Sequence, residues 1–401
     1  MKNIRGWTTT KIVEVASKMK AGGTPSRSYP KYWQGEIPFV LIEDMTNTER
    51  YLIETQEHIS KLGLQSSSAW MVPDNTILLS MYATLGKVVI NKIPVATNQA
   101  ILGIIPTKVD RDFLYYLLQF SADRLSKLNS QTTQKNLNKQ IVSDFEITYP
   151  VEHAEQRAIA DILTTVDDAI EQTEALIHKY QRIKQGLMQD LLKEKESWTI
   201  LPLGIACKKG GGSVQTGPFG SQLHSSDYKD EGIPIITVEH IGDNEIIHKN
   251  LPLVGKEDYL RLSKYKIITG DLVFSRVGAI DRCGYVSENE NEWLFSGRLL
   301  RVRPGSLFDS RFLSYLLNHY PSRLWILNNS VGSTMKCLNT TILSELPVPI
   351  PSITEQKEIG EKISSIDDLI RNTVQEMEKI ARIKQGLMQD LLTGKVRVNY
   401  E

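Results

Sequence analysis

The residues of this 401-residue chain that come closest to a chemical motif are a glycine-rich stretch and two pairs of adjacent aspartates. The stretch KGGGSVQTGPFGS, at residues 209–221, resembles a phosphate-binding loop but lacks the Gly-Lys-Ser/Thr ending and the spacing of a P-loop. The aspartates are Asp167-Asp168 and Asp367-Asp368. Because consecutive residues on a helix point to different faces, we interpret them as solvated or partner-facing side chains and not as a catalytic carboxylate pair.

Other signatures of catalysis are missing from the sequence. It contains no GxGxxG loop, no GxSxG nucleophile, no helicase-type phosphate loop, and no Asn-Pro-Pro-aromatic or Asp-Pro-Pro-Tyr stretch of an adenine amino-methyltransferase. The seven histidines show neither HExxH nor Cys/His metal spacing, and the three cysteines form no CxxC pair. We therefore expect a non-catalytic chain with no cofactor and no metal site.

Composition is that of an ordinary globular protein, with 41% hydrophobic and 23% charged residues. No apolar run is long enough to span a membrane, and the N-terminus lacks the apolar core of a signal peptide, so we expect a cytoplasmic protein. The 47 basic and 47 acidic residues cancel. Residues 1–150 nevertheless hold 17 basic against 13 acidic side chains, a small excess that would suit an anionic partner but that ordinary scatter explains better.

The chain contains an internal repeat. RIKQGLMQDLL occurs at residues 182–192 and again at 382–392, and the match extends upstream without a gap. Residues 154–192 and 354–392 are identical at 19 of 39 positions. The segments before each repeat correspond loosely, so the order along the chain is variable, constant, variable, constant.

Both constant segments show the heptad spacing of a coiled coil, with no proline inside. The seam positions are Ile159, Leu163, Val166, Ile170, Thr173, Ile177, Tyr180, Lys184, Leu187 and Leu191, and the same positions 200 residues later. Each segment predicts a helix of roughly 58 Å. Antiparallel pairing is favoured, because the domain between the helices could then start and end at one end of the pair. Residues whose numbers sum to 550, such as Thr173 and Met377, should face each other.

The variable segments are predicted to be mixed α/β. Short β-rich runs are broken by Gly, Pro and Asn, and a helix follows in each, at 110–128 and 309–327. The predicted fold class is therefore α/β (α+β), with two mixed domains, an antiparallel coiled coil and a pseudo-two-fold internal repeat. The predicted boundaries are 1–150, 151–196, 197–350 and 351–401.

The whole chain resembles the specificity subunits of type I restriction–modification systems. The residues that carry the resemblance are the paired EQ…IKQGLMQDLL segments, the closing LLTGKVRV at 391–398, the proline before each constant segment, and the Leu-Asn loops at 129–140 and 328–341. The resemblance implies that each variable domain is a target-recognition domain reading one half of a split site in double-stranded DNA. It also implies that the constant helices act as a spacer and dock two methyltransferase (modification) subunits, which restriction (motor-nuclease) subunits join. Chemistry would then reside in the partners.

Base readout uses Arg, Lys and short polar side chains, and the loops supply these at corresponding places in both halves. The candidate DNA-binding residues are Arg27, Lys87, Thr133, Gln134, Lys135 and Asn138 in the first domain, and Ser221, Gln222, Arg276, Arg282, Thr334, Lys336 and Asn339 in the second. Thr133-x-Lys135-x-x-Asn138 recurs as Thr334-x-Lys336-x-x-Asn339. Recurrence could equally reflect the fold, because Asn side chains stabilise turns.

The repeated motif is more strictly kept than a helix seam requires. Seam packing explains the leucines but not the polar and glycine positions, so we predict partner docking there. These residues are Gln185, Gly186, Gln189, Asp190, Gln385, Gly386, Gln389 and Asp390. A glycine inside a helix costs about 1 kcal/mol relative to Ala, which suggests that another backbone approaches closely.

Three other interpretations stay open. The chain could be the specificity subunit of a two-subunit system whose partner fuses nuclease and methyltransferase. It could be a non-catalytic coiled-coil organiser, which predicts no sequence-specific DNA binding. It could also be an enzyme with an unrecognised site, such as a nuclease, which predicts metal-dependent turnover by the isolated chain.

Overall fold

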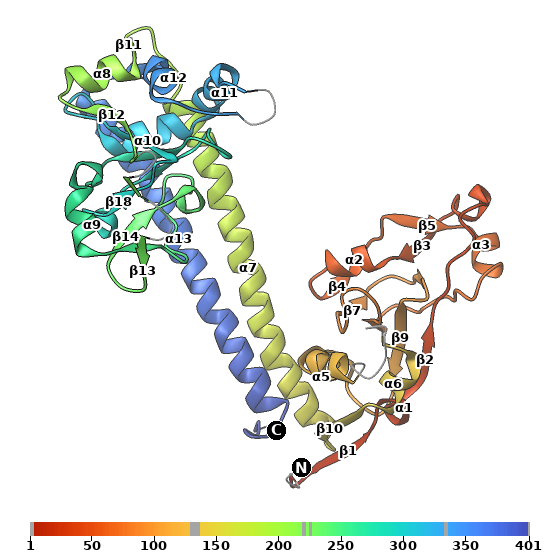
Figure 1. Ribbon diagram of the computed structural model, residues 1–401. Helices are drawn as coiled ribbons and strands as arrows, with labels where there is room; N and C mark the ends of the chain where they lie inside the picture. The colour runs from red at the N-terminus through yellow and green to blue at the C-terminus, as the bar shows by residue number, and fades with distance from the viewer. Residues whose placement is uncertain (1–3, 129–136, 219–221, 224–226, 333–335, 400–401) are drawn as a thin grey trace. The chain divides into compact units, whose positions relative to one another are not determined.

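A computed structural model describes residues 4–128, 137–218, 222–223, 227–332 and 336–399 of the chain. It divides into two compact units, one formed by residues 1–174 with 375–401 and the other by residues 175–374. Figure 1 shows the elements of each unit. Within the described part, no helix has both the length and the apolar character that a membrane span needs.

Two long helices run through both units. They are α7 (His153–Leu191) and α13 (Ile353–Leu391), with 39 residues each (Figure 1). The sequence predicted helices at 154–192 and 354–392, and both are confirmed within one residue. Each unit therefore contains the first part of one helix and the last part of the other.

The first unit is built on a five-stranded sheet with the order β2-β9-β6-β7-β4, a three-stranded sheet with the order β5-β3-β8, and the pair β1-β10. Its strands are β1 (Trp7–Lys11), β2 (Ala16–Ala21), β3 (Ile37–Val40), β4 (Tyr51–Leu52), β5 (Glu57–Ile59), β6 (Ile77–Ser80), β7 (Val88–Asn91), β8 (Ala96–Thr97), β9 (Ile101–Pro106) and β10 (Glu146–Pro150). Its shorter helices are α1 (Ile12–Val15), η1 (Pro30–Tyr32), α2 (Ile42–Thr46), α3 (Lys61–Gln65), α4 (Arg111–Phe120), α5 (Ala122–Lys127) and α6 (Lys139–Asp144).

The second unit contains two four-stranded sheets, β12-β19-β16-β17 and β13-β15-β14-β18, and the pair β11-β20. Its strands are β11 (Thr199–Pro202), β12 (Ser213–Thr216), β13 (Tyr228–Lys229), β14 (Ile233–Ile236), β15 (Leu253–Val254), β16 (Leu272–Ser275), β17 (Cys283–Tyr285), β18 (Leu294–Phe295), β19 (Leu299–Arg303) and β20 (Pro347–Ile350). Its helices are α8 (Leu203–Lys209), η4 (Val238–His240), α9 (Lys256–Arg261), η5 (Ser263–Tyr265), η6 (Glu288–Glu290), α10 (Ser310–Asn318), α11 (Tyr320–Asn329) and α12 (Thr340–Glu345).

The two units share one topology. β2-β9-β6-β7 in the first corresponds to β12-β19-β16-β17 in the second, and β5-β3-β8 corresponds to β15-β14-β18. In the sheets that contain β3 and β14 the edge pair is parallel, β3 with β8 and β14 with β18, while the neighbouring pair, β3 with β5 and β14 with β15, is antiparallel. The first unit also has a parallel pair in its five-stranded sheet, β4 with β7. The loose sequence correspondence of the variable segments thus reflects a common fold, and the chain is mixed α/β as predicted.

Each unit has a main core between its sheet and its long helices. In the first, Ile159 and Leu163 of α7 and Leu391 of α13 pack with the sheet and with α4. In the second, Ile359 and Ile363 of α13 pack in the same way with α10. Residues that the heptad pattern placed at the seam therefore also pack in the core of the adjoining domain.

The helices predicted at 110–128 and 309–327 are each two helices. α4 ends at Phe120 and α5 begins at Ala122, while α10 ends at Asn318 and α11 begins at Tyr320 with Pro321 in its first turn. Proline is tolerated in the first turn of a helix but not in its interior, so the second break was detectable in the sequence. The break at Ser121 has no such signal.

Candidate DNA interface and partner-docking grooves

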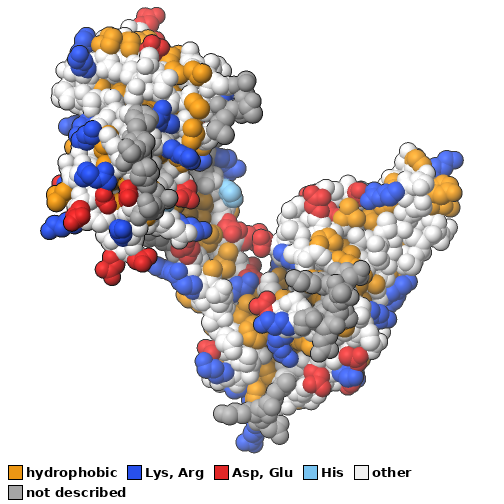
Figure 2. Space-filling model, viewed as in Figure 1, with side chains coloured by type: hydrophobic (Ala, Val, Ile, Leu, Met, Phe, Trp, Pro, Cys, Tyr) orange, Lys and Arg blue, Asp and Glu red, His pale blue; other side chains and the backbone are white. Residues whose placement is uncertain are grey.

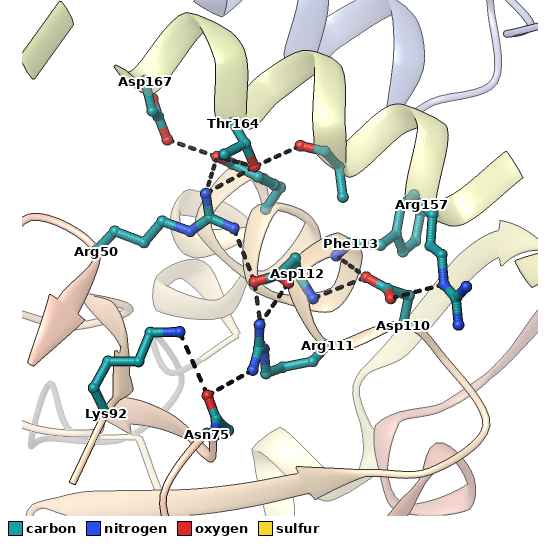
Figure 3. A network of polar contacts seen from close by, with 12 residues as sticks. Arg50, Asn75, Lys92, Asp110, Arg111, Asp112, Phe113, Arg157, Thr164 and Asp167 are labelled. Carbon is teal, nitrogen blue, oxygen red and sulfur yellow. Dashed lines mark hydrogen bonds and ion pairs between the residues drawn. The ribbon is translucent and has the colours of Figure 1, made fainter. Parts of the chain in front are cut away.

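A buried polar network fastens the first unit's α4 to α7 (Figure 3). The Arg50 guanidinium, whose side chain is 9% exposed, donates to Asp112 at 2.8 Å and to Thr164 of α7 at 2.7 Å. Arg111 also pairs with Asp112 at 2.7 Å. Burial raises the pKa of Asp112, but hydrogen bonds and charges from Arg111 and Arg50 outweigh it, so the pKa of this carboxyl falls below its ordinary value.

Residues at the start of each repeat hold the adjoining domain in the same way. The Gln156 side chain accepts from the Asp110 N–H at 2.6 Å and donates to the Pro150 carbonyl at 2.7 Å. Gln356 accepts from the Asp309 N–H at 2.8 Å and donates to Pro351 at 3.0 Å. Both glutamines are fully buried, so the repeated glutamine has the same structural role in both halves.

Asp167 and Asp367 are half-buried and bound within the chain, so the solvated interpretation is wrong for both, while the partner-facing one stays a prediction. Asp167 accepts from Tyr116 at 2.8 Å and pairs with Lys384 at 2.6 Å. Asp367 accepts from Tyr315 at 2.6 Å and pairs with Lys184 at 2.6 Å. Their neighbours Asp168 and Asp368 are exposed. The lysines were taken for seam residues, and each ends on a carboxylate of the other helix within its unit.

Beside each of these ion pairs lies a groove. The first unit has a groove of about 710 Å³ and the second one of about 570 Å³. Six lining residues are equivalent in the repeat: Asp167, Ile170, Lys384, Gln385, Met388 and Gln389 in the first groove, and Asp367, Ile370, Lys184, Gln185, Met188 and Gln189 in the second. Four of the eight predicted docking residues therefore line a groove.

The repeated glycines have open space where a side chain would lie. A Cβ built on Gly186 or Gly386 meets no atom within 4 Å. Gly360 of α13 differs, because a Cβ there would lie 3.1 Å from Asp309 Oδ1 and 3.2 Å from the Phe312 nitrogen. Packing within the described chain thus explains Gly360 but not Gly186 or Gly386. Of the remaining docking positions, Asp190 is exposed and Asp390 pairs with Lys395 at 2.7 Å.

The grooves differ in charge beyond these six equivalent residues. The first carries five further carboxylates, from Glu49, Asp123, Asp168, Glu171 and Glu174. The second carries Asp281, which pairs with Arg323 at 3.2 Å. Part of the difference lies inside the repeat, where Glu171 corresponds to Arg371. Each groove thus has an equivalent wall formed by the repeat, but the two grooves differ in charge.

Several candidate DNA-binding residues have structural partners. Arg27 pairs with Glu57 at 2.7 Å, and its guanidinium lies 3.6 Å from the centre of the Trp33 ring. Asn138 accepts from the Ile141 N–H at 2.9 Å and caps α6, and Asn339 accepts from Ile342 at 2.8 Å and caps α12. The repeated asparagine is thus explained by helix capping.

Three of the other candidates lie in connections between paired strands, Lys87 between β6 and β7, and Arg276 and Arg282 between β16 and β17. Lys87 precedes β7 and is half-buried, as is Arg282, which precedes β17. Gln222 accepts from the Tyr265 hydroxyl at 2.8 Å, Arg276 follows β16 and donates to the Gly297 carbonyl at 3.3 Å, and Lys336 donates to the Leu327 carbonyl at 2.5 Å. Thr133, Gln134, Lys135, Ser221 and Thr334 lie outside the described residues.

Arg276 also lines a hollow of about 800 Å³ that sequence reasoning did not find. Glu239 and Arg298 share it. Arg298 could have been noticed, since it opens the β-rich run RLLRVRP, but nothing in the sequence places it beside Glu239. In the view of Figure 2, basic side chains are scattered among acidic ones and form no continuous basic face, which agrees with the zero net charge.

Comparison with known proteins agrees with the two-part architecture. The family model described as "Type I restriction modification DNA specificity domain" matches residues 4–180 and 217–384. The chain is 24% identical over 398 residues to the type I restriction enzyme MjaVIII specificity subunit of Methanocaldococcus jannaschii, covering 92% of this chain and 91% of that one. It is 24% identical over 404 residues to the EcoBI specificity subunit of Escherichia coli, covering 91% and 81%.

Solved structures show the same fold. The crystal structure of the type I restriction–modification S subunit from M. genitalium matches with a TM-score of 0.62 at 16% identity, covering 98% of this chain and 97% of that one. The family model matches the chain twice, and this defines the class of the protein as one with DNA specificity domains. The chain belongs to the type I restriction–modification specificity family, which confirms the resemblance found in the sequence.

Proposed function

We propose that this chain is the specificity subunit of a type I restriction–modification complex, with each variable domain reading one half of a bipartite, asymmetric DNA site. The observation that carries the proposal is the family match, which occurs once in each half of the chain. The common sheet order of the two units supports it, because a constant frame with different side chains suits two readers with different targets.

A domain exchange tests the proposal. Residues 1–150 would be replaced by the matching segment of a relative, and methylated adenines would be mapped by single-molecule sequencing of a host genome that carries the complete system. One half-site should change and the other should stay. The reciprocal exchange of residues 197–350 is the matched control and should change only the other half. A single exchange that altered both halves would contradict the two-reader arrangement.

The long helices are proposed to form an antiparallel coiled-coil spacer related by a pseudo-two-fold. The ion pairs Lys384–Asp167 and Lys184–Asp367 support this pairing within each unit, because both join residues whose numbers sum to 551, one from the predicted 550. All twenty seam positions are buried or half-buried. The half-sites would lie about one turn of the DNA double helix apart, roughly 34 Å. Inserting about one helical turn at equivalent points of both helices should change the gap between half-sites and leave the bases of each half unchanged.

The two grooves are proposed to dock two identical methyltransferase subunits, one per groove. Their equivalent walls of Lys, Gln, Met and Gln support equal partners. The open face at Gly186 and Gly386 supports close approach of a partner backbone. Restriction subunits would join the assembled core.

Catalysis is proposed to reside in these partners. Highly purified chain should neither methylate nor cleave DNA, and methyl transfer should appear when methyltransferase subunits are added. The mass of the copurifying partner separates a fused nuclease–methyltransferase from separate subunits. A purely structural organiser would give no sequence-specific binding with partners present. DNA cleavage by the chain alone in the presence of a divalent metal ion would contradict the assignment of catalysis to the partners.

A further inference from the structure

The hollow in the second unit has two arginines and one carboxylate on its rim. It measures about 800 Å³, and Arg276, Arg298 and Glu239 line it together with Thr237 and Tyr228. These residues follow β14, β16 and β18, apart from Tyr228, which belongs to β13, so four separate segments meet here. The site therefore has a rigid base of strand ends.

The backbone frame beneath the two arginines recurs in the first unit. The Arg276 N–H donates to the Arg298 carbonyl at 2.9 Å, and the Met81 N–H donates to the Ala100 carbonyl at 2.8 Å. The Arg276 carbonyl accepts from Leu338, and the Met81 carbonyl accepts from Leu137, both at 2.9 Å.

A side-chain contact recurs beside this frame. The hydroxyl of Ser275 donates to the Val277 carbonyl, as Ser80 donates to Tyr82. Arg276 is thus the structural equivalent of Met81, and Arg298 that of Ala100.

The same frame carries different chemistry in the two units. Two apolar side chains in the first are replaced by two guanidinium groups in the second. Folding does not require this change, because the frame forms with either pair. Side chains that differ on a constant frame are what a module with a different target needs.

The charges of the hollow indicate which part of DNA it suits. Arg298 is exposed, and no hydrogen bond or ion pair to another described residue engages its guanidinium. Glu239 is also exposed and accepts from the Thr237 hydroxyl at 3.3 Å. A carboxylate facing phosphates would be repelled, whereas base edges offer donors as well as acceptors. The mixture of Arg and Glu therefore favours base edges over the phosphate backbone.

We propose that this hollow reads a G·C base pair in the half-site of the second domain, with the Arg298 guanidinium donating two N–H hydrogen bonds, one to O6 and one to N7 of guanine. The proposal rests on the proposed function. A bidentate contact of this kind separates the right base from a wrong one by about 5- to 150-fold.

The test uses the complete methyltransferase complex. Arg298→Ala, Arg298→Lys and the control Lys256→Ala, an exposed residue of α9 outside the hollow, would be compared by methylome sequencing. Arg298→Ala should relax one G·C position of one half-site about 5- to 150-fold, and Lys256→Ala should leave the motif unchanged. Arg298→Lys should keep overall DNA affinity but relax the same position, because Lys keeps the charge and loses the fork.

Three outcomes would overturn the proposal. The first is a fall in methylation with no change in base preference at any position of the motif, which marks a phosphate contact. The second is a relaxed base preference in the other half-site. The third is an unchanged motif in Arg298→Ala. Copurification of methyltransferase subunits with each variant shows that the chain has folded. If the unmodified complex gave no bipartite motif, the proposed function itself would fail, and that result is distinct from all three.

Discussion

Replacing Gly186 or Gly386 with alanine should stabilise the isolated chain. Each glycine lies inside a 39-residue helix, and the added Cβ would meet no atom within 4 Å. Ala is better than Gly in a helix interior by about 1 kcal/mol. In a unit of about 200 residues this gain raises Tm by roughly 2–4 °C. Calorimetry should show the shift in the second unit's transition for Gly186→Ala and in the first unit's for Gly386→Ala.

The same positions should respond with the opposite sign when partners bind. Leucine at one position should obstruct the open face beside one groove, so native mass spectrometry of the complex should show one methyltransferase subunit per chain instead of two. Gly186→Leu with Gly386→Leu should bind none and remain folded. Two bound subunits in the double variant would refute docking at this face.

A third helical glycine supplies the control. Gly360→Ala places a Cβ 3.1 Å from Asp309 Oδ1 and 3.2 Å from the Phe312 nitrogen, so it should give no gain in Tm and leave assembly unchanged. A loss of stability in Gly186→Ala would contradict the open space found beside Gly186.

Arg50→Met should destabilise the first unit by about 3 kcal/mol in urea unfolding, because a buried ion pair loses one partner. The pKa of Asp112 is lowered on folding, so its contribution to stability is complete above the unfolded value near 3.8 and is lost as pH falls through the lower folded pKa. Asp112→Asn should remove that part of the pH dependence, measured by unfolding between pH 6 and 2 and contradicted by parallel curves. Glu171→Arg should make partner docking in the acidic first groove weaker and less dependent on salt. Titration of the methyltransferase subunit at two salt concentrations measures this, and an affinity that falls with salt as steeply as in the unmodified chain would contradict the prediction.

The spans of the two long helices were predictable because they depend on local periodicity. The heptad pattern predicted helices at 154–192 and 354–392, and the observed helices agree within one residue. The mixed α/β character of the variable segments was also predictable, since strand and turn propensities act over a few residues. The break at Ser121 was missed because no proline or glycine marks it.

The roles of individual polar residues depended on partners far away in the chain. Asp167 and Asp367 looked like solvated helix positions. Each, however, accepts a hydrogen bond from a tyrosine of its own domain and pairs with a lysine of the other long helix. Asn138 and Asn339 recurred as candidates for base readout and are helix caps. A single residue's type could not distinguish these roles, because the same amide or carboxylate serves either.

By itself the sequence determined the repeat, the helices and the family of this protein, because identity and periodicity are read along the chain. Only the tertiary structure decided which residues share a site. The grooves combine α7, α13 and a domain helix, and the hollow combines Glu239, Arg276 and Arg298 from three strand ends. Such sets arise from packing between distant segments, and the free energy of packing depends on surfaces that no local pattern records.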